Sequence, residues 1–222
     1  MSDLEGIRQR RSIRKYKPDP VPREAIEEVL GAAILAPSGK NRQPWKFLVY
    51  QGAAKAALLD EMEKGIARET GGNAALPGLA SGLAYAGATL RTMRAAPAVI
   101  LVLNTNAASP FEAGTPESRF MAMYDDLAVG AAIQNMLIRA AELGLGTLWI
   151  GNTGYAYEEL TRFVGTDHRL VGAVALGWPD EAPKARPRKP LADVVEWREE
   201  GARKALRFCG GAAFCREFRL PL

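Results

Sequence analysis

Apolar residues recur along this chain with two spacings, and these predict helices that alternate with single strands. Residues 22–35 carry Ile26, Val29, Leu30 and Ala33 as one stripe, which is the spacing of an amphipathic helix. Helical patterns also cover residues 3–10, 53–69, 79–93, 157–164 and 191–206. Short apolar runs predict strands at residues 47–50, 98–103, 147–150 and 170–177. The run at 98–103 is apolar throughout, so we expect it to be buried on both faces of a sheet.

The longest helical pattern covers residues 119–143 and is apolar almost all round between residues 127 and 138. Its polar stripe consists of Asn135, Arg139 and Glu142. A surface helix could not tolerate this composition, so we expect the helix in the centre of the molecule or against its counterpart in a dimer. The alternation of helices and strands, without an internal repeat, predicts an α+β or mixed α/β domain.

Composition narrows the class of protein. Of the 222 residues, 48% are hydrophobic and 24% are charged, which is typical of a globular protein. No apolar run approaches the ~18 residues of a membrane span, and the charged N-terminus does not resemble a secretory signal, so we expect a cytoplasmic protein without a membrane partner. Cys209, Cys215 and the single histidine, His168, are too few for a disulfide framework or a zinc site, and no metal is expected.

Basic residues form two clusters, at positions 8–17 and 184–189, although the formal net charge is only +4. Because guanidinium groups bind phosphate oxygens in pairs, the two clusters could converge on one phosphate-bearing ligand. The modest net charge disfavours a nucleic acid as that ligand. Gly39-Lys40 lacks the remaining residues of a phosphate loop, and Trp149 stands where a dinucleotide-binding fingerprint would have its third glycine. No protein side chain is assigned as catalytic.

Four segments resemble, in order and spacing, the FMN-dependent nitroreductase family: RRSIRKY at 10–16, APSGKNRQPWKF at 36–47, GLGTLWIG at 144–151 and RPRKP at 186–190. The resemblance implies a nitroreductase-like fold, with a central, mostly antiparallel sheet surrounded by helices and a long helix at the interface of a homodimer. It also implies a single FMN-binding domain over residues 1–207, with a substrate lid at 104–124, followed by a C-terminal tail at 208–222.

The resemblance assigns the first cofactor contacts to the Arg-Arg-Ser segment. In the family the first arginine, the serine and the basic residue two places later reach the flavin, and here these are Arg10, Ser12 and Arg14, with Arg11 in the same segment. We expect Arg14 beside flavin N1 and O2, where a cation stabilises the negative charge of the reduced pyrimidine. Without the other motifs, the cluster would be interpreted as a solvated basic helix.

Two further motifs complete the expected flavin site. Members of the family bring the second motif to the flavin from the other subunit, and its matching residues are Pro37, Ser38, Asn41 and Gln43. Trp45, which follows them, is expected to pack in the core.

Ile150, Gly151 and Asn152 match the turn whose backbone amides point at flavin N5 and O4, where glycine permits close approach. Arg186 and Arg188 match the two basic positions that hold the phosphate from the C-terminal side, although this run could also be a soluble linker.

The resemblance implies an oxidoreductase in which NAD(P)H reduces FMN, leaves, and is replaced by a nitroaromatic, a quinone or a similar small-molecule acceptor. Flavin N5 carries this chemistry, so no protein nucleophile is expected. Phe111, Phe120 and Tyr124 are candidate lid residues, which could instead pack the start of the long helix. The alternatives are a flavin-binding sensor or storage protein without turnover, and a family member that performs dehalogenation, dehydrogenation or flavin fragmentation.

Overall fold

The computed structural model describes residues 5–198, and the chain divides into two units with the boundary between Ala185 and Arg186. The first unit contains, in chain order, α1 (Glu5–Gln9), α2 (Arg23–Ala33), the 3-10 helix η1 (Gly39–Asn41), β1 (Trp45–Gln51), α3 (Gly52–Thr70), η2 (Pro77–Gly82), α4 (Leu83–Ala95), β2 (Ala98–Asn104), α5 (Pro116–Glu142), β3 (Gly146–Ile150), η3 (Asn152–Ala156), α6 (Tyr157–Val164) and β4 (Arg169–Gly177). Helices and strands therefore alternate as the hydrophobic pattern predicts.

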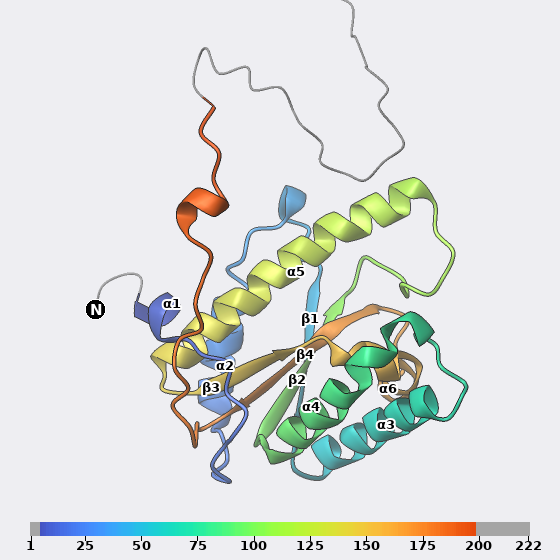
Figure 1. Ribbon diagram of the computed structural model, residues 1–222, viewed down its shortest axis with the longest axis horizontal. Helices are drawn as coiled ribbons and strands as arrows, with labels where there is room; N and C mark the ends of the chain where they lie inside the picture. Colours follow the sequence, from blue (N-terminus) through green and yellow to red (C-terminus); the bar gives the residue numbers. More distant parts are fainter. Residues whose placement is uncertain (1–4, 199–222) are drawn as a thin grey trace, which may run out of the picture. The chain divides into compact units, whose positions relative to one another are not determined.

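The four strands form one sheet in the order β1-β2-β4-β3, and every neighbouring pair is antiparallel (Figure 1). Each predicted apolar run lies within one of these strands. Strand β2 lies between β1 and β4, and all seven of its residues are buried. This confirms the predicted sheet and the burial of residues 98–103 on both faces.

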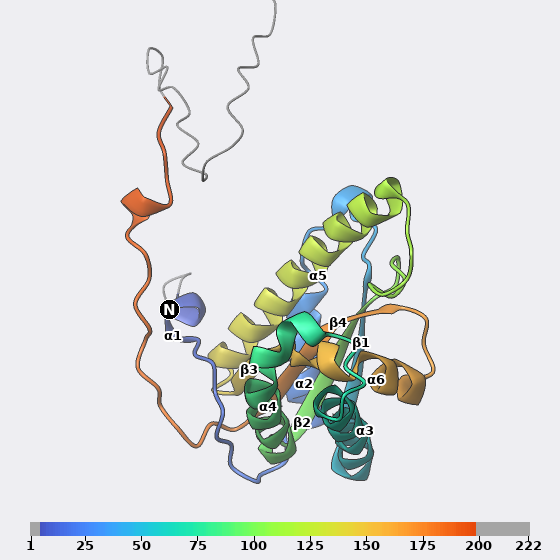
Figure 2. The ribbon, with the colours of Figure 1, turned by 45° about the vertical axis from the view of Figure 1, so that its right-hand side comes forward.

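Helices cover both faces of the sheet, as Figures 1 and 2 show. Because successive side chains of a strand point to opposite faces, β2 contributes to two separate apolar clusters. Ala98, Ile100 and Val102 pack with α2 and α5. On the other face, the alternate β2 residues pack with α3, α4 and α6, and these are Val99, Leu101 and Leu103. The first unit is thus a three-layer α/β/α sandwich.

Helix α5 begins three residues earlier than the pattern predicts, because Thr115 caps it and Pro116 occupies the first helical position. The Thr115 hydroxyl oxygen accepts a hydrogen bond from the Ser118 backbone N–H at 3.2 Å. The helix ends at Glu142, and Gly144 then takes a left-handed conformation with φ of 74°.

The expected central position of α5 is only partly correct. Val129, Ile133 and Met136 are buried against the sheet side, but Leu127 is 66% exposed. Other exposed apolar residues accompany Leu127 on the N-terminal half of the helix, and they are Phe120, Met121, Met123 and Tyr124. A single chain therefore covers one side of α5 and leaves an apolar surface on the other.

The second unit corrects one prediction. Of the helix expected over residues 191–206, the described part contains a single 3-10 turn, η4 (Leu191–Asp193), and residues 194–198 are not helical. Val194 and Trp197 are 61% and 79% exposed, and a short helix without packing is unstable in water. Residues 199–206, the predicted domain end at 207, and the tail with Cys209 and Cys215 lie outside the described residues.

Candidate functional site

The basic segment after α1 is attached to the edge strand β3. The Ile13 backbone N–H donates a hydrogen bond to the Thr147 carbonyl at 2.9 Å, and Ser12 forms a parallel β-bridge with Thr147. Close contact requires Gly146, because a Cβ there would lie 2.8 Å from the Ile13 side chain. An edge strand has unpaired backbone groups, so this segment satisfies them. Arg10, Arg11, Ser12 and Arg14 are thereby brought beside the start of β3.

A buried hydrogen bond of Tyr16 and an exposed pair of hydrogen bonds to Glu181 fix the backbone around Arg14. The Tyr16 hydroxyl donates to the Ile13 carbonyl at 2.9 Å, and burial raises the pKa of Tyr16 well above its usual value, so the phenol remains a donor. A Glu181 carboxylate oxygen accepts hydrogen bonds from the backbone N–H groups of Arg14, at 2.5 Å, and Lys15, at 3.2 Å. The Arg14 side chain itself is exposed and donates to the Ser12 carbonyl at 3.2 Å.

A cavity of about 380 Å³ lies beside this segment and is lined by Arg10, Arg11, Glu181 and the residues from 144 to 147. Arg11 donates to the carbonyl oxygens of Arg8, at 2.6 Å, and Arg10, at 2.9 Å. Within residues 5–198, no carboxylate forms an ion pair with either arginine. Glu181 is occupied by the two backbone N–H groups, so the donors that remain fit a phosphate group.

The loop that carries the second motif is held in an unusual conformation. Lys40, Asn41 and Gln43 have φ angles of 52°, 54° and 47°, in the left-handed region that favours glycine. Each such residue costs on the order of 1–3 kcal/mol and persists only when its surroundings enforce the conformation. The Ser38 hydroxyl oxygen accepts a hydrogen bond from the Gln43 N–H at 3.0 Å, and Arg42 pairs with Asp125 of α5 at 2.9 Å. Asn41 and Gln43 remain exposed.

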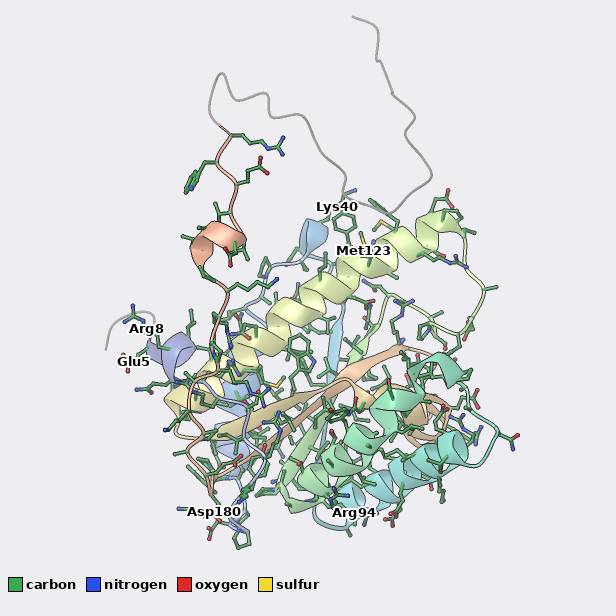
Figure 3. All side chains as sticks on the ribbon, in the orientation of Figure 1. Glu5, Arg8, Lys40, Arg94, Met123 and Asp180 are labelled. Carbon is green, nitrogen blue, oxygen red and sulfur yellow. The ribbon has the colours of Figure 1, made fainter. Side chains whose placement is uncertain are left out.

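Within one chain, this loop and the basic segment lie at different stretches of α5. Arg42 contacts Asp125, whereas α1 packs where Gly6 meets Ile138. These two α5 positions are thirteen residues apart, or about 20 Å along the helix axis. Figure 3 shows Lys40 and Met123 near the N-terminal half of α5, far from Glu5 and Arg8. A single chain therefore does not bring the two motifs together.

The turn after β3 leaves one residue open. Gly151 is exposed, and no atom lies within 4 Å of the place where its Cβ would be, so its backbone is accessible. Ile150 is buried. The Asn152 side-chain amide donates to the Thr89 hydroxyl oxygen of α4 at 3.0 Å, so it is turned toward α4. Of the predicted turn residues, Gly151 is thus the one that a ligand can approach along its backbone.

The three candidate lid residues do not form one cluster. The Phe111 ring lies edge-on to Tyr157 of α6, with centroids 5.2 Å apart. Phe120 and Tyr124 lie edge-on to each other on the first turns of α5, with centroids 4.9 Å apart, and both are about half exposed. The predicted 104–124 lid therefore consists of a loop against α6 and a helical segment with an exposed aromatic pair.

The predicted phosphate ligands on the C-terminal side belong to the second unit. Arg186 and Arg188 are exposed there, and an Arg188 Nη donates to the Arg186 carbonyl at 3.2 Å. Their part in phosphate binding stays a prediction. His168 lies in a bend, where its N–H donates to the Thr166 hydroxyl oxygen at 3.2 Å.

Sequence reasoning missed two adjacent carboxylates, Asp125 and Asp126, which hold the loops around the site. Asp126 accepts a hydrogen bond from Asn104 at 2.8 Å and pairs with Arg169 at 2.7 Å, and Asp125 pairs with Arg42. An acidic pair at the border of an apolar helix was the available signal. Among residues 5–198 there is no cluster of metal-binding side chains and no helix long and apolar enough to cross a membrane.

Comparison with known proteins agrees with this architecture. The profile of the nitroreductase family matches residues 7–178. The Bacillus subtilis protein YfhC, named as an NAD(P)H nitroreductase, is 28% identical over 84% of this chain and 89% of its own length. The 5,6-dimethylbenzimidazole synthase of Rhodospirillum rubrum is 29% identical over 78% and 79%, respectively.

Solved structures share the fold. A Desulfovibrio desulfuricans protein described as a nitroreductase, in complex with FMN, is 30% identical and superposes with a TM-score of 0.65 over 90% of this chain and 98% of the other. The family profile and the names of these relatives thus support an oxidoreductase of the nitroreductase class. The chain belongs to the nitroreductase family.

Proposed function

We propose that this protein is an FMN-dependent oxidoreductase that oxidises NAD(P)H and reduces nitroaromatics, quinones or similar acceptors. The observation that carries the proposal is the arrangement along β3. The cavity with Arg10 and Arg11 lies at the start of the strand, and the open backbone of Gly151 follows its end. Gly151 lies five residue steps of extended chain beyond Gly146, or about 17 Å, over which an extended mononucleotide can lie.

Different residues of one chain would contact different parts of the cofactor. Arg10 and Arg11 supply charge-assisted hydrogen bonds for the phosphate, and Ser12 and Arg14 supply donors for the polyol chain and the pyrimidine edge. The exposed backbone at Gly151 permits close approach of the flavin ring. When bound, FMN supplies hydride transfer at N5, so the protein needs no nucleophile of its own. The FMN complex of the Desulfovibrio desulfuricans relative supports this cofactor.

The second part of the proposal is a homodimer with shared sites. The motif loop lies about 20 Å along α5 from the basic segment of its own chain, so a second copy is needed to bring Pro37, Ser38, Asn41 and Gln43 to the flavin. The exposed apolar surface of α5 around Leu127 supplies the contact area. An obligate interface of this kind buries more than ~2,000 Å² in total.

We expect a ping-pong reaction, in which NAD(P)H leaves before the acceptor binds to the same open face. The name of the relative YfhC supports a nicotinamide donor. The 104–124 segment would cover the acceptor, with Phe120 and Tyr124 as the exposed aromatic contacts. Arg186 and Arg188 would complete phosphate binding from the C-terminal side.

The test is a two-step titration of the purified protein under anaerobic conditions. We expect the flavin absorbance of a protein nearly saturated with FMN. NADH or NADPH should bleach this absorbance, and addition of a quinone should restore it. Parallel initial-rate lines at several acceptor concentrations would support the ping-pong order. A protein that neither contains nor takes up FMN would refute the cofactor, and flavin that neither nicotinamide bleaches would favour a sensing or storage role.

The relative from Rhodospirillum rubrum gives a specific reason to examine a second chemistry. After reduction, the flavin is exposed to air without an added acceptor, and its spectrum is followed. Full recovery of the oxidised spectrum supports the proposed oxidoreductase. Irreversible loss of the flavin would favour fragmentation of the flavin itself.

A further inference from the structure

Two adjacent carboxylates of α5 hold two different loops. Asp125 is 2% exposed and pairs with Arg42 of the 37–43 loop, with Oδ2 2.9 Å from Nη2. Asp126 accepts a hydrogen bond from the Asn104 amide at 2.8 Å and pairs with Arg169 at 2.7 Å. Neighbouring residues of a helix project about 100° apart, so Asp125 and Asp126 point in different directions and contact different loops.

The contacts of Asp126 extend into the base of the 104–124 segment. The Asn104 side-chain oxygen accepts a hydrogen bond from the Asn106 N–H at 3.0 Å. Arg169 donates from Nε to the Ala108 carbonyl and from its backbone N–H to the Ala107 carbonyl, both at 2.9 Å. Asp126 thus orients the two side chains that bind the backbone of residues 106–108.

Apolar packing alone does not hold this segment in place. A cavity of about 340 Å³ is lined by residues 106–110 and 112–114 of this segment, together with Ser118, Arg119, Met121 and Arg169. Apart from the Phe111 ring, which packs against Tyr157, residues that line a cavity gain little from van der Waals contact, so the hydrogen bonds at the base contribute much of what positions the segment.

The two loops are also joined directly. The Pro44 carbonyl accepts hydrogen bonds from the Thr105 N–H at 2.7 Å and from the Thr105 hydroxyl at 3.2 Å. Pro44 follows the left-handed residues of the motif loop, and Thr105 follows Asn104. This contact joins the ends of the two loops and involves neither Asp125 nor Asp126, so each carboxylate can be tested separately.

We infer that Asp125 and Asp126 are positioning residues, of which Asp125 fixes the loop that reaches the partner's cofactor and Asp126 fixes the segment that selects the acceptor. The assignment to cofactor and acceptor rests on the proposed function. The fixing of the two loops does not rest on it, and can be measured without a cofactor.

The experiment compares Asp125→Asn with Asp126→Asn, which keep the shape of the side chain and remove its charge. Hydrogen exchange of the protein without FMN should rise at least tenfold at residues 38–44 in the first variant and at residues 104–109 in the second. In the holoprotein, Asp125→Asn should weaken FMN binding at least tenfold. Asp126→Asn should raise the acceptor KM at least fivefold and leave the FMN Kd within twofold.

Conservative variants separate positioning from general stability. Arg42→Lys keeps the charge and should bind FMN within threefold of the wild-type affinity. Arg42→Ala should weaken FMN binding as much as Asp125→Asn does. Arg169→Lys can pair with Asp126 but cannot also donate to the Ala108 carbonyl, so it should reproduce part of the rise in KM. Asp60→Asn, which removes an exposed ion pair with Arg94, is the matched control and should change neither the FMN Kd nor the acceptor KM.

The outcomes are decisive in each case. Equal exchange in all variants, or the same effect of both substitutions on FMN and acceptor, would overturn the inference. If either Asn variant fails to fold, Arg42→Ala replaces Asp125→Asn and Arg169→Lys replaces Asp126→Asn in the same measurements. A wild-type protein that binds no FMN would refute the proposed function, while the exchange data would still test the fixing of the loops.

Discussion

Substitution of Gly146 by alanine tests whether the cofactor segment depends on its packing against β3. The new Cβ would lie 2.8 Å from Ile13 Cγ1 and 3.0 Å from Ile13 Cβ. Carbon atoms in contact normally stand about 3.5–4.0 Å apart, so the segment must move away by roughly 0.7–1 Å. Rotation of the Ile13 side chain cannot relieve this contact, because its Cβ is fixed to the backbone and its branched side chain is stiff.

The displacement removes a hydrogen bond as well as good packing. The 2.9 Å contact between the Ile13 N–H and the Thr147 carbonyl would lengthen beyond the range of a hydrogen bond. Overpacking costs about 1–3 kcal/mol, and the hydrogen bond contributes about 0.5–1.5 kcal/mol. We expect the free energy of unfolding to fall by about 1.5–4.5 kcal/mol. Loss of one charge-assisted FMN contact would cost about 1.5–3 kcal/mol more in binding, roughly 10- to 150-fold in Kd.

The assay is denaturant unfolding together with FMN titration, and Gly31→Ala is the control. Gly31 lies in α2, and no atom lies within 4 Å of the place that a Cβ would take there, so its substitution should stabilise the protein by about 0.4–1 kcal/mol without affecting FMN. In the double variant, Gly31→Ala should restore part of the stability and none of the FMN affinity. Wild-type stability and FMN affinity in Gly146→Ala would refute the packing of this segment.

Three further predictions concern charge, assembly and pH. Arg10→Ala should weaken FMN binding by about 1.5–3 kcal/mol in a fluorescence titration, and an unchanged Kd would place the phosphate elsewhere. Leu127→Asp should leave the chain folded, because this side chain is 66% exposed, but it should shift sedimentation toward a monomer and lower the flavin content together with it. Burial by itself would raise the pKa of Glu159, but the hydrogen bond from Arg68 and nearby positive charge lower it below its usual value. Ionised Glu159 therefore contributes fully to the free energy of unfolding above the ordinary carboxyl pKa of about 4.3, and this contribution is lost as the pH falls through the lower pKa of the folded state. Glu159→Gln should make the free energy of unfolding less dependent on pH in this range.

Local hydrophobic patterning was sufficient for most elements of the fold. The unbroken apolar run at 98–103 predicts a strand buried on both faces, and the bounds of α6 at residues 157–164 agree with the pattern. Such patterns work because the period of side chains along a helix or strand reports which faces are buried. The same reasoning is wrong for residues 194–198, where the pattern is present but the apolar side chains of Val194 and Trp197 are exposed.

The family could be inferred from the chain alone, because the order and spacing of short motifs are properties of the sequence. How those motifs are distributed over the molecule depends on the tertiary structure. Arg42 and Asp125 are 83 residues apart in sequence, and Arg169 and Asp126 are 43 apart, so no local pattern reveals that they pair. The turn of Asn152 toward Thr89, and the separation of the two motifs along α5, likewise depend on long-range packing. Periodicity indicates that a face of a helix or strand is buried, whereas the element that packs against this face depends on the whole fold.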